Sequence, residues 1–353
     1  MVQTVLAASS EEPEFMSSTV TPMEDLKKDP DSLKSKSELL VSRIQAEFCR
    51  ALEEVDGKKK FTVEKWDRPE GGGGITCVME DGEVFEKAGV NVSVVHGLLP
   101  TAAVPQMTSD HKDIKLSGPQ LKDGKLPFFA AAVSSVIHPW NPHVPTVHFN
   151  YRYFEVEDAE GKKHSWFGGG TDLTPSYLDE EDAVHFHKTL KDACDAHTKK
   201  NYPAFKKWCD DYFVIKHRGT CSHNGGPRCE RRGVGGIFFD DLKLSDEYDV
   251  FQFVTSCADS VIPSYLPIVK KHKNDVFTDN QREWQLLRRG RYAEFNLVYD
   301  RGTKFGLATP GGRIESILMS LPLNAKWKYN HAPTPGSPEA AMMDVLKSPR
   351  DWL

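Results

Sequence analysis

Residues 146–153, Thr-Val-His-Phe-Asn-Tyr-Arg-Tyr, place three polar side chains of complementary chemistry two residues apart. Side chains alternate between the faces of a strand, so we expect His148, Asn150 and Arg152 on one face and the hydrophobic residues between them on the other. Arginine binds a carboxylate in a bidentate fork, and neutral histidine gives or takes a proton near pH 7. The pattern favours a site for a carboxylate-bearing substrate, although the solvated face of a half-exposed strand explains it equally well.

Two further segments place an acid where it can act as a proton acceptor. Residues 168–170 are three glycines that shortly precede Asp172. Such a backbone passes close to a flat ligand or an aromatic neighbour, or it forms a tight turn that Asp172 caps. No Gly-Lys-Ser/Thr follows, so the segment is not a phosphate loop. Asp300 and Arg301 are expected at the end of a strand over 293–299, where a rigid element supports functional groups.

Arginines recur beside Gly, Asn or Asp at positions 152, 218, 232, 301 and 313. Surface arginine runs such as Arg288-Arg289 are usually only solvated. Several arginines for several substrate carboxylates is the simplest joint interpretation of the recurrent set. Gly311 and Gly312 give Arg313 a permissive backbone.

Histidines at 138, 143 and 148 suggest a metal site less well than they suggest hydrogen-bonded structural residues. Their spacing is not that of a helical HExxH motif, and no paired cysteines accompany them. His185 and His187 lie two apart on an expected helix and cannot both face one site, so His187 is interpreted as a packed residue. We therefore expect no metal ligand set here.

The elements that position these residues come in runs rather than in strict β-α-β alternation, which favours an α+β fold with helices packed on an antiparallel sheet. Helices are expected over 32–55, where Leu40, Ile44, Phe48 and Leu52 share one face, and over 179–196, 246–271 and 338–346. Strands are expected over 75–79, 83–95, 128–137, 146–156, 293–299 and 314–321.

The composition is that of an ordinary globular protein. The 353 residues have a formal net charge of −6, so no overall basic excess draws the chain to nucleic acid, and no apolar run approaches the ~20 residues of a membrane span. Seven scattered cysteines suit separate buried thiols better than a disulfide framework. We expect a flexible tail over 1–30 and one catalytic domain over 31–353. The first 26 residues contain no Lys or Arg, which is unlike a mitochondrial presequence.

Six strings, in order along the chain, resemble the oxygen-dependent coproporphyrinogen III oxidases. They are Ser-Ser-Val-Ile-His-Pro, His-Phe-Asn-Tyr-Arg-Tyr-Phe, Trp-Phe-Gly-Gly-Gly-Thr-Asp-Leu-Thr-Pro, Lys-Lys-Trp-Cys-Asp-Asp-Tyr-Phe, Gly-Gly-Ile-Phe-Phe-Asp-Asp-Leu and Arg-Arg-Gly-Arg-Tyr-Ala-Glu-Phe-Asn-Leu-Val-Tyr-Asp-Arg-Gly-Thr. The resemblance extends from about residue 30 to the final Arg-Asp-Trp-Leu.

The resemblance implies oxidative decarboxylation of two propionate groups of coproporphyrinogen III to vinyl groups, giving protoporphyrinogen IX in haem biosynthesis. It implies His148 as proton donor, with Asp300, Arg301 and Asp172 holding pyrrole nitrogens and propionates. Substrate-binding positions are implied at Ser134, Asn150, Tyr151, Arg152, Arg232, Gly311, Gly312 and Arg313.

For the whole protein the resemblance implies a large curved antiparallel sheet with helices on both sides, assembled as a homodimer. It implies no organic cofactor and no metal, with O2 as co-substrate. It also implies the mitochondrial intermembrane space of animal forms, although no presequence is visible and the cytoplasm is the alternative.

The chain departs from the family between Arg218-Gly219 and Glu230-Arg231, where ten residues, 220–229, interrupt a string that is usually continuous. The insertion is rich in turn-forming residues and is expected to be a surface loop or an error in the gene sequence. Cys221, His223 and Cys229 are weak evidence for a metal site. Two other functions stay open: a His-ligated metal oxidase and a cofactor-free porphyrinogen carrier.

Overall fold

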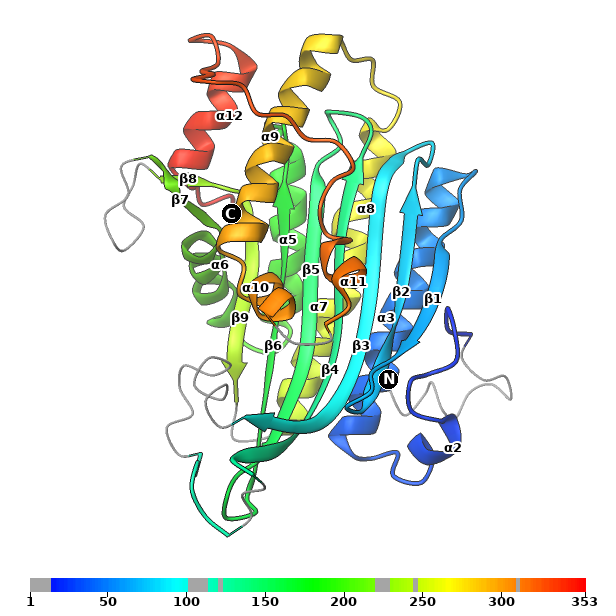
Figure 1. Ribbon diagram of the computed structural model, residues 1–353. Helices are drawn as coiled ribbons and strands as arrows, with labels where there is room; N and C mark the ends of the chain where they lie inside the picture. The colour runs from blue at the N-terminus through cyan, green and yellow to red at the C-terminus, as the bar shows by residue number, and fades with distance from the viewer. Residues whose placement is uncertain (1–13, 101–113, 120–122, 220–228, 244–246, 309–311) are drawn as a thin grey trace.

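Seven antiparallel strands form one curved sheet whose spatial order is β1–β2–β3–β4–β5–β6–β9 (Figure 1). The computed structural model describes residues 14–100, 114–119, 123–219, 229–243, 247–308 and 312–353. The strands of the sheet are β1 (Thr62–Asp67), β2 (Gly72–Glu80), β3 (Phe85–Pro100), β4 (Lys125–Pro139), β5 (Thr146–Glu157), β6 (Lys163–Thr174) and β9 (Gly235–Leu242). A separate two-stranded ladder pairs β7 (Val214–Gly219) with β8 (Cys229–Arg231).

Helices cover both faces of this sheet, as the sequence predicted. One face packs against α3 (Leu33–Asp56), α5 (Glu180–Asp195), α7 (Glu247–Asp259) and α8 (Val261–His272), where the rings of Phe48 and Phe149 lie 5.1 Å apart (Figure 1). The other face lies beneath α9 (Asp279–Val298), α10 (Arg301–Ala308) and α11 (Ile314–Leu318). The remaining helices are α2 (Met23–Leu26), α6 (Asn201–Tyr212) beside β9, and α12 (Pro338–Lys347) beside β8.

Local sequence explains where the long helices begin and end. The Ser32 side chain accepts a hydrogen bond from the Ser35 amide at the start of α3, and Gly57 ends that helix with a φ of +79°. Thr278 and Gln281 form a capping box at the start of α9. These polar and glycine signals satisfy the backbone groups that a helix end leaves open.

Most expected elements are confirmed, with α5 beginning after its cap Asp179 and the expected helix over 246–271 divided into α7 and α8 at Ser260. Two expected strands are wrong. Residues 293–299 continue α9, and residues 314–321 begin with α11. Tyr292, Phe295 and Asn296 are buried while Leu297 and Val298 are exposed, which is the period of a helix rather than of a strand. The sequence alone does not record this burial, and the seven residues 293–299 are too few for their hydrophobic pattern to distinguish a helix from a strand.

Part of the segment expected as a tail contacts the rest of the molecule. The Thr21 amide donates to Glu38 Oε1 at 2.8 Å, and Lys65 Nζ donates to the Thr19 carbonyl at 2.8 Å.

Five cysteines are free and buried, as expected, namely Cys49, Cys77, Cys194, Cys209 and Cys257. Cys229, in contrast, is buried and disulfide-bonded. Cys221 lies outside the described residues. Among the described helices, none is both long and apolar enough to cross a membrane.

Helix α9 is attached to the sheet by a buried carboxylate. Glu86 is fully buried and accepts hydrogen bonds from Arg282 Nη2 at 2.7 Å, from Asn324 Nδ2 at 2.6 Å and from Arg289 Nη1. Arg289 also donates to the Pro139 carbonyl at 2.6 Å. One carboxylate therefore pairs with two guanidinium groups where the helix crosses strands β3 and β4.

We expect Glu86→Ala to lower the free energy of unfolding by about 3–5 kcal/mol, because it leaves buried arginines without their counter-charge. Urea unfolding followed by circular dichroism measures the loss. The matched control is Glu283→Ala, which removes a surface carboxylate of α9 and should leave the unfolding midpoint nearly unchanged. Equal midpoints for Glu86→Ala and wild type would contradict the anchoring role.

Candidate functional site

The alternation predicted for strand β5 is confirmed. His148, Asn150 and Arg152 are half-buried on the face beneath α9–α11, while Phe149 and Tyr151 are buried on the opposite face. Tyr151 OH bonds to Thr171 Oγ1 at 2.6 Å and donates to the Cys257 carbonyl at 3.0 Å. The Tyr151 side chain therefore points away from the polar face on which the other β5 candidates lie.

Ser134 lies on that polar face, directly opposite Asn150 in the β4–β5 register. Asn91 faces Ser134 from β3, and Thr76 faces Asn91 from β2, with Thr76 Oγ1 donating to Asn91 Oδ1 at 2.6 Å. Four neighbouring strands thus contribute one polar residue each to a continuous row. Antiparallel pairing brings these residues together although they are scattered over 75 residues of sequence.

His148, Asp172 and Arg232 form a chain of charge-assisted hydrogen bonds. His148 Nδ1 lies 2.6 Å from Asp172 Oδ1, and Arg232 Nη2 donates to both oxygens of Asp172 at 2.9 and 2.8 Å. An ionised carboxylate only accepts, so Nδ1 of His148 carries the hydrogen in this bond. Nε2, on the far side of the ring, is then the atom available to take or give a proton.

Arg232 is 3% exposed and lies among aromatic rings. Its guanidinium carbon is 4.1 Å from the Phe213 ring centroid and 4.5 Å from that of Tyr292. Burial alone raises the pKa of the Asp172 carboxyl, but the charge of Arg232, followed by the contact with His148, lowers that pKa below its usual value. Asp172 therefore stays ionised and keeps His148 oriented.

A second cluster joins two arginines through one carboxylate. Asp240 Oδ1 lies 2.5 Å from Arg152 Nη2, and Asp240 Oδ2 accepts from Arg301 Nη2 at 2.9 Å. Arg152 Nη1 also donates to Asn150 Oδ1 at 2.7 Å. Arg152 reaches β9 by lying across β6 at Gly168, where a Cβ atom would come within 2.6 Å of the guanidinium. The glycine therefore leaves room for the arginine.

Asp300 immediately precedes α10 and caps it, instead of ending a strand, because 293–299 continues helix α9. Its Oδ2 accepts from the Thr303 amide at 2.7 Å, and its Oδ1 accepts from Tyr212 OH at 3.1 Å. Burial and the charge of Asp300 raise the pKa of Tyr212 to about 12, so Tyr212 stays a donor. Tyr212 stacks on Phe238 with ring centroids 4.2 Å apart, which places Asp300 near the β9 edge.

Arg313 lies at the other end of the polar face. It precedes α11 and is ion-paired with Glu64 of β1, while Ser316 Oγ lies 2.7 Å from Thr76 Oγ1. Gly312 adjoins Arg313, and Gly311 lies outside the described residues. The arginines of the site are thus distributed along the sheet instead of meeting at one point.

Sequence reasoning assigned no role to Asp240, Tyr212, Phe213 or Asn296, although all four belong to strings that carry the family resemblance. Asn296 Oδ1 accepts from Arg232 Nη1 at 3.1 Å. Arg218, in contrast, is bonded to Glu294 through Nε at 2.8 Å and Nη2 at 2.6 Å. The only available signal for Asp240 was an acid at the end of a hydrophobic strand.

His138 and His187 have structural partners. His138 Nε2 lies 3.0 Å from the Ser320 carbonyl, and burial lowers the pKa of His138 well below its usual value. His187 bonds to Tyr202 OH at 2.9 Å and to the Val234 carbonyl at 3.1 Å, and burial lowers its pKa to about 3. His187 is therefore a packed residue, as expected.

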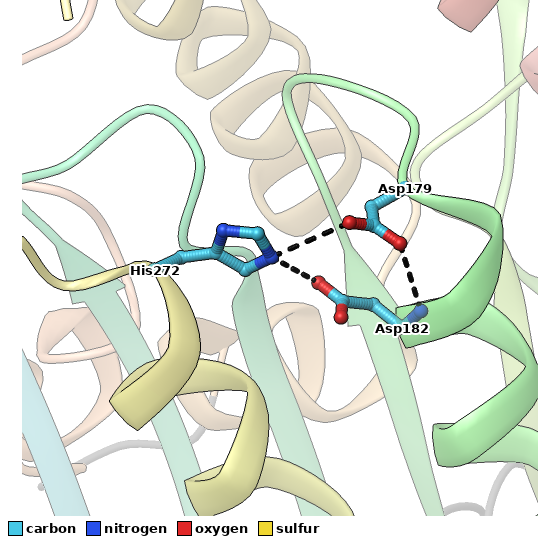
Figure 2. A group of neighbouring side chains, drawn as sticks. All are labelled: Asp179, Asp182 and His272. Carbon is cyan, nitrogen blue, oxygen red and sulfur yellow. Dashed lines mark hydrogen bonds and ion pairs between the residues drawn. The ribbon is translucent and has the colours of Figure 1, made fainter. Parts of the chain in front are cut away.

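Figure 2 shows a group formed by Asp179, Asp182 and His272, whose potential metal-ligand atoms lie within 4.8 Å of one another. His272 Nε2 is 2.9 Å from Asp182 Oδ2 and 3.5 Å from Asp179 Oδ2. Lys271 Nζ lies 2.9 Å from each carboxylate, so a protein cation is already paired with both. Asp179 also caps α5, which gives the cluster a structural role.

The ladder β7–β8, where the ten-residue insertion lies, is held against α9. Gly219 and Cys229 face each other in the ladder, so the chain leaves and re-enters it at neighbouring positions. Glu294 of α9 accepts from Arg218 and from His217 Nε2 at 2.8 Å, and Arg288 Nη1 donates to Glu230 at 2.5 Å. Residues 220–228 lie outside the described residues.

Comparisons with known proteins agree on one family. A family model described as coproporphyrinogen III oxidase matches residues 36–352. The mitochondrial oxygen-dependent coproporphyrinogen-III oxidase of Rattus norvegicus is 61% identical over 96% of this chain and 73% of its own length. The enzyme of Drosophila melanogaster is 60% identical over 96% and 83%, and the chloroplastic enzyme of Glycine max is 54% identical over 91% and 80%.

Acid should weaken the attachment of the β7–β8 ladder to α9. Burial alone raises the pKa of Glu294, but hydrogen bonds from Arg218, His217 and Trp327 lower it to about 2. Because the folded-state pKa is depressed, the stabilisation is complete above the unfolded value of about 4.3 and is lost as pH falls toward 2. We expect Glu294→Gln to be less stable than wild type at pH 7, with the difference narrowing between pH 4.5 and 2.

Urea unfolding at a series of pH values measures this difference. Glu180→Gln, which removes an exposed carboxylate paired with Arg350, serves as the control and should differ little from wild type throughout. A Glu294→Gln deficit that stays constant down to pH 2 would show that the bonds to Glu294 do not depend on its charge.

Proposed function

The chain belongs to the coproporphyrinogen III oxidase family, and on that premise we propose that it oxidises coproporphyrinogen III to protoporphyrinogen IX with O2. The observation that carries the proposal is the single sheet face on which the His148–Asp172–Arg232 chain lies beside the Arg152–Asp240–Arg301 cluster. It combines an oriented proton carrier with guanidinium groups, which is what a substrate bearing several propionates requires.

In each half of the reaction one propionate arm, one O2 and one proton give a vinyl group, CO2 and hydrogen peroxide. The arm loses one hydrogen from the carbon next to the ring and the carboxylate from the carbon beyond it. The electron pair of the broken C–C bond forms the vinyl double bond, and O2 receives two electrons. Two such rounds, one for each arm, give the product.

Asp300 is proposed as the acceptor of a pyrrole N–H proton, which makes the electron-rich ring reactive toward O2. O2 then adds to the ring carbon next to the propionate, and the bound peroxide takes the hydrogen from the arm as CO2 leaves. His148 supplies, through Nε2, the proton with which hydrogen peroxide departs, and Asp300 returns its proton to the pyrrole nitrogen. Asp172 orients His148, and Arg232 keeps Asp172 ionised.

Substrate binding is assigned to the polar face around these groups. Arg152, Arg301 and Arg313 are proposed to bind propionate carboxylates, with Ser134 and Asn150 between them. Gly312 and the undescribed Gly311 are proposed to let the backbone approach the substrate. Arg232 is proposed to act behind this face, since its guanidinium is already bonded to Asp172 and Asn296. Tyr151, whose side chain faces the core, would contact substrate only through its backbone.

We further propose that residues 31–353 form one catalytic domain that uses O2 as co-substrate without an organic cofactor or metal. A homodimer is proposed as its assembly. The mitochondrial names of animal relatives and the chloroplastic names of plant relatives suggest an organellar location, and the mitochondrial intermembrane space is proposed for this chain.

The function is tested by incubating metal-stripped protein with coproporphyrinogen III in air and under nitrogen, and measuring protoporphyrin fluorescence after oxidation of the product. We expect product in air, none under nitrogen, and one hydrogen peroxide for each vinyl group formed.

Absence of product in air would be followed by the same assay on a chain that lacks residues 220–229. Product from the shortened chain alone would assign the failure to the insertion. Absence of product from both chains would contradict the proposed function, and restoration of activity only by added metal would favour a metal oxidase.

Asp300→Ala should lower kcat by about 10²–10⁴-fold with little change in the affinity for coproporphyrinogen III, because it removes a proton acceptor. Asp300 also caps α10, so Asp300→Asn, which keeps an oxygen acceptor, should show the same loss of turnover with less loss of stability. Single-turnover rates and anaerobic binding separate the two effects. The control is Asp192→Asn, on the exposed face of α5, and a normal kcat in Asp300→Asn would exclude the proposed role.

A further inference from the structure

We propose that Asp240 is a positioning residue that holds Arg152 and Arg301 side by side as a two-guanidinium receptor for one carboxylate of the substrate. The inference rests on the proposed function, which it deepens by assigning a place for a propionate and a residue that shapes that place. It starts from the observation that both oxygens of Asp240 are used, one for each arginine.

The two arginines come from different elements, one from a strand of the sheet and one from a helix. Arg152 belongs to β5, whereas Arg301 is the first residue of α10. Two guanidinium groups repel each other, and long arginine side chains are flexible. The carboxylate of Asp240 joins them with distances of 2.5 and 2.9 Å, and it is therefore the group that keeps the pair together.

Burial separates Asp240 from the face that the substrate approaches. The Asp240 side chain is 8% exposed, whereas the side chains of Arg152 and Arg301 are 31% and 50% exposed. Asp240 therefore lies beneath the arginines, and a substrate carboxylate can reach the guanidinium edges without displacing it. Each bond to Asp240 uses one N–H of a group that has five.

The net charge of the cluster favours the binding of a single carboxylate. Two guanidinium groups and one carboxylate leave one positive charge, which one propionate neutralises. Arg152 is further fixed by its bond to Asn150, and Arg301 lies over the Tyr212 ring at 5.3 Å from the centroid. The receptor is thus preorganised before substrate binds, which lowers the cost of binding and improves orientation.

Gly168 supports the same arrangement independently. The Arg152 guanidinium crosses β6 at this residue, where a Cβ atom would lie 2.6 Å from Cζ and 2.7 Å from Nε. Any side chain at 168 therefore displaces Arg152 from the path to Asp240. The receptor depends on a glycine and a carboxylate that do not themselves touch the substrate.

The test uses the full chain with Asp240→Asn, which keeps the size of the side chain and removes its charge. We expect kcat/KM for coproporphyrinogen III to fall about 10–100-fold. Affinity for the unreactive coproporphyrin III, measured by fluorescence without turnover, should fall about 10-fold. Gly168→Ala should cause both losses through the displaced arginine. Asp211→Asn, which removes an exposed partner of Lys207, should leave both values unchanged.

A double-mutant cycle separates positioning from a general structural role. If Asp240 acts through Arg152, then Asp240→Asn should lower kcat/KM by less than about threefold in a protein that already carries Arg152→Gln. Independent, multiplying losses would overturn the proposal, and so would a kcat/KM for Asp240→Asn within twofold of wild type. Tighter binding of coproporphyrin III to Asp240→Asn would show instead that Asp240 competes with the substrate.

Failure of the proposed function can be distinguished from failure of the Asp240 proposal. In that case the wild-type chain forms no product in air, while the binding measurement still compares wild type with Asp240→Asn. Thermal melting of each variant shows whether a loss of affinity comes from unfolding. Weaker binding by a folded Asp240→Asn protein supports the receptor, and unchanged binding refutes it.

Discussion

The ion pair between Arg232 and Asp172 is the interaction on which the site depends. Both side chains are at most 3% exposed, so burying either charge costs desolvation free energy. The bidentate bond offsets that free energy only if both partners are present. The pair joins β6 to the segment that follows β8, and Asn296 extends it to α9. His148 has its Nδ1 partner only because this buried carboxylate is ionised.

The aromatic rings around Arg232 make that arrangement specific. Phe213, Tyr292 and Phe295 lie 4.1, 4.5 and 5.0 Å from its guanidinium carbon and replace water around a planar cation. A lysine offers neither the planar fork nor the stacking surface, so the position requires arginine. Buried aromatic rings therefore pack against the arginine that holds Asp172 in place, so the same contacts belong to the hydrophobic packing and to the polar site.

A common rule governs the arginines that are proposed to bind propionates. Arg152 and Arg301 share Asp240, and Arg313 is paired with Glu64. Protein carboxylates fix these guanidinium groups and reduce their mutual repulsion, at the expense of part of their positive charge. We expect such a surface to select carboxylates by geometry more than by overall attraction, which agrees with the net negative charge of the chain.

The sequence predicted features that depend on neighbouring residues, and it did not predict features that depend on residues far apart along the chain. The alternation in β5 is a property of neighbouring residues, and it correctly placed His148, Asn150 and Arg152 on one face. The helical nature of 293–299 follows from packing of Tyr292 and Phe295 against Arg232, more than 50 residues away, which no local pattern records. Asp240 was missed for the same reason, since its partners lie 88 and 61 residues from it along the chain.

The antiparallel meander explains why the site is wide rather than deep. Neighbouring strands lie about 4.8 Å apart, so the distance from β2, beneath Ser316, to β9, which carries Asp240, is about 24 Å. Arg313 and Arg301 lie near opposite ends of that width, with the polar row and His148 between them. A tetrapyrrole with carboxylates on several sides matches such a face better than a narrow pocket does. The row from β2 to β5 contains one polar residue per strand, and a one-residue change of register would move that residue to the core side. The hydrophobic packing beneath the sheet therefore also determines which groups lie on the polar face.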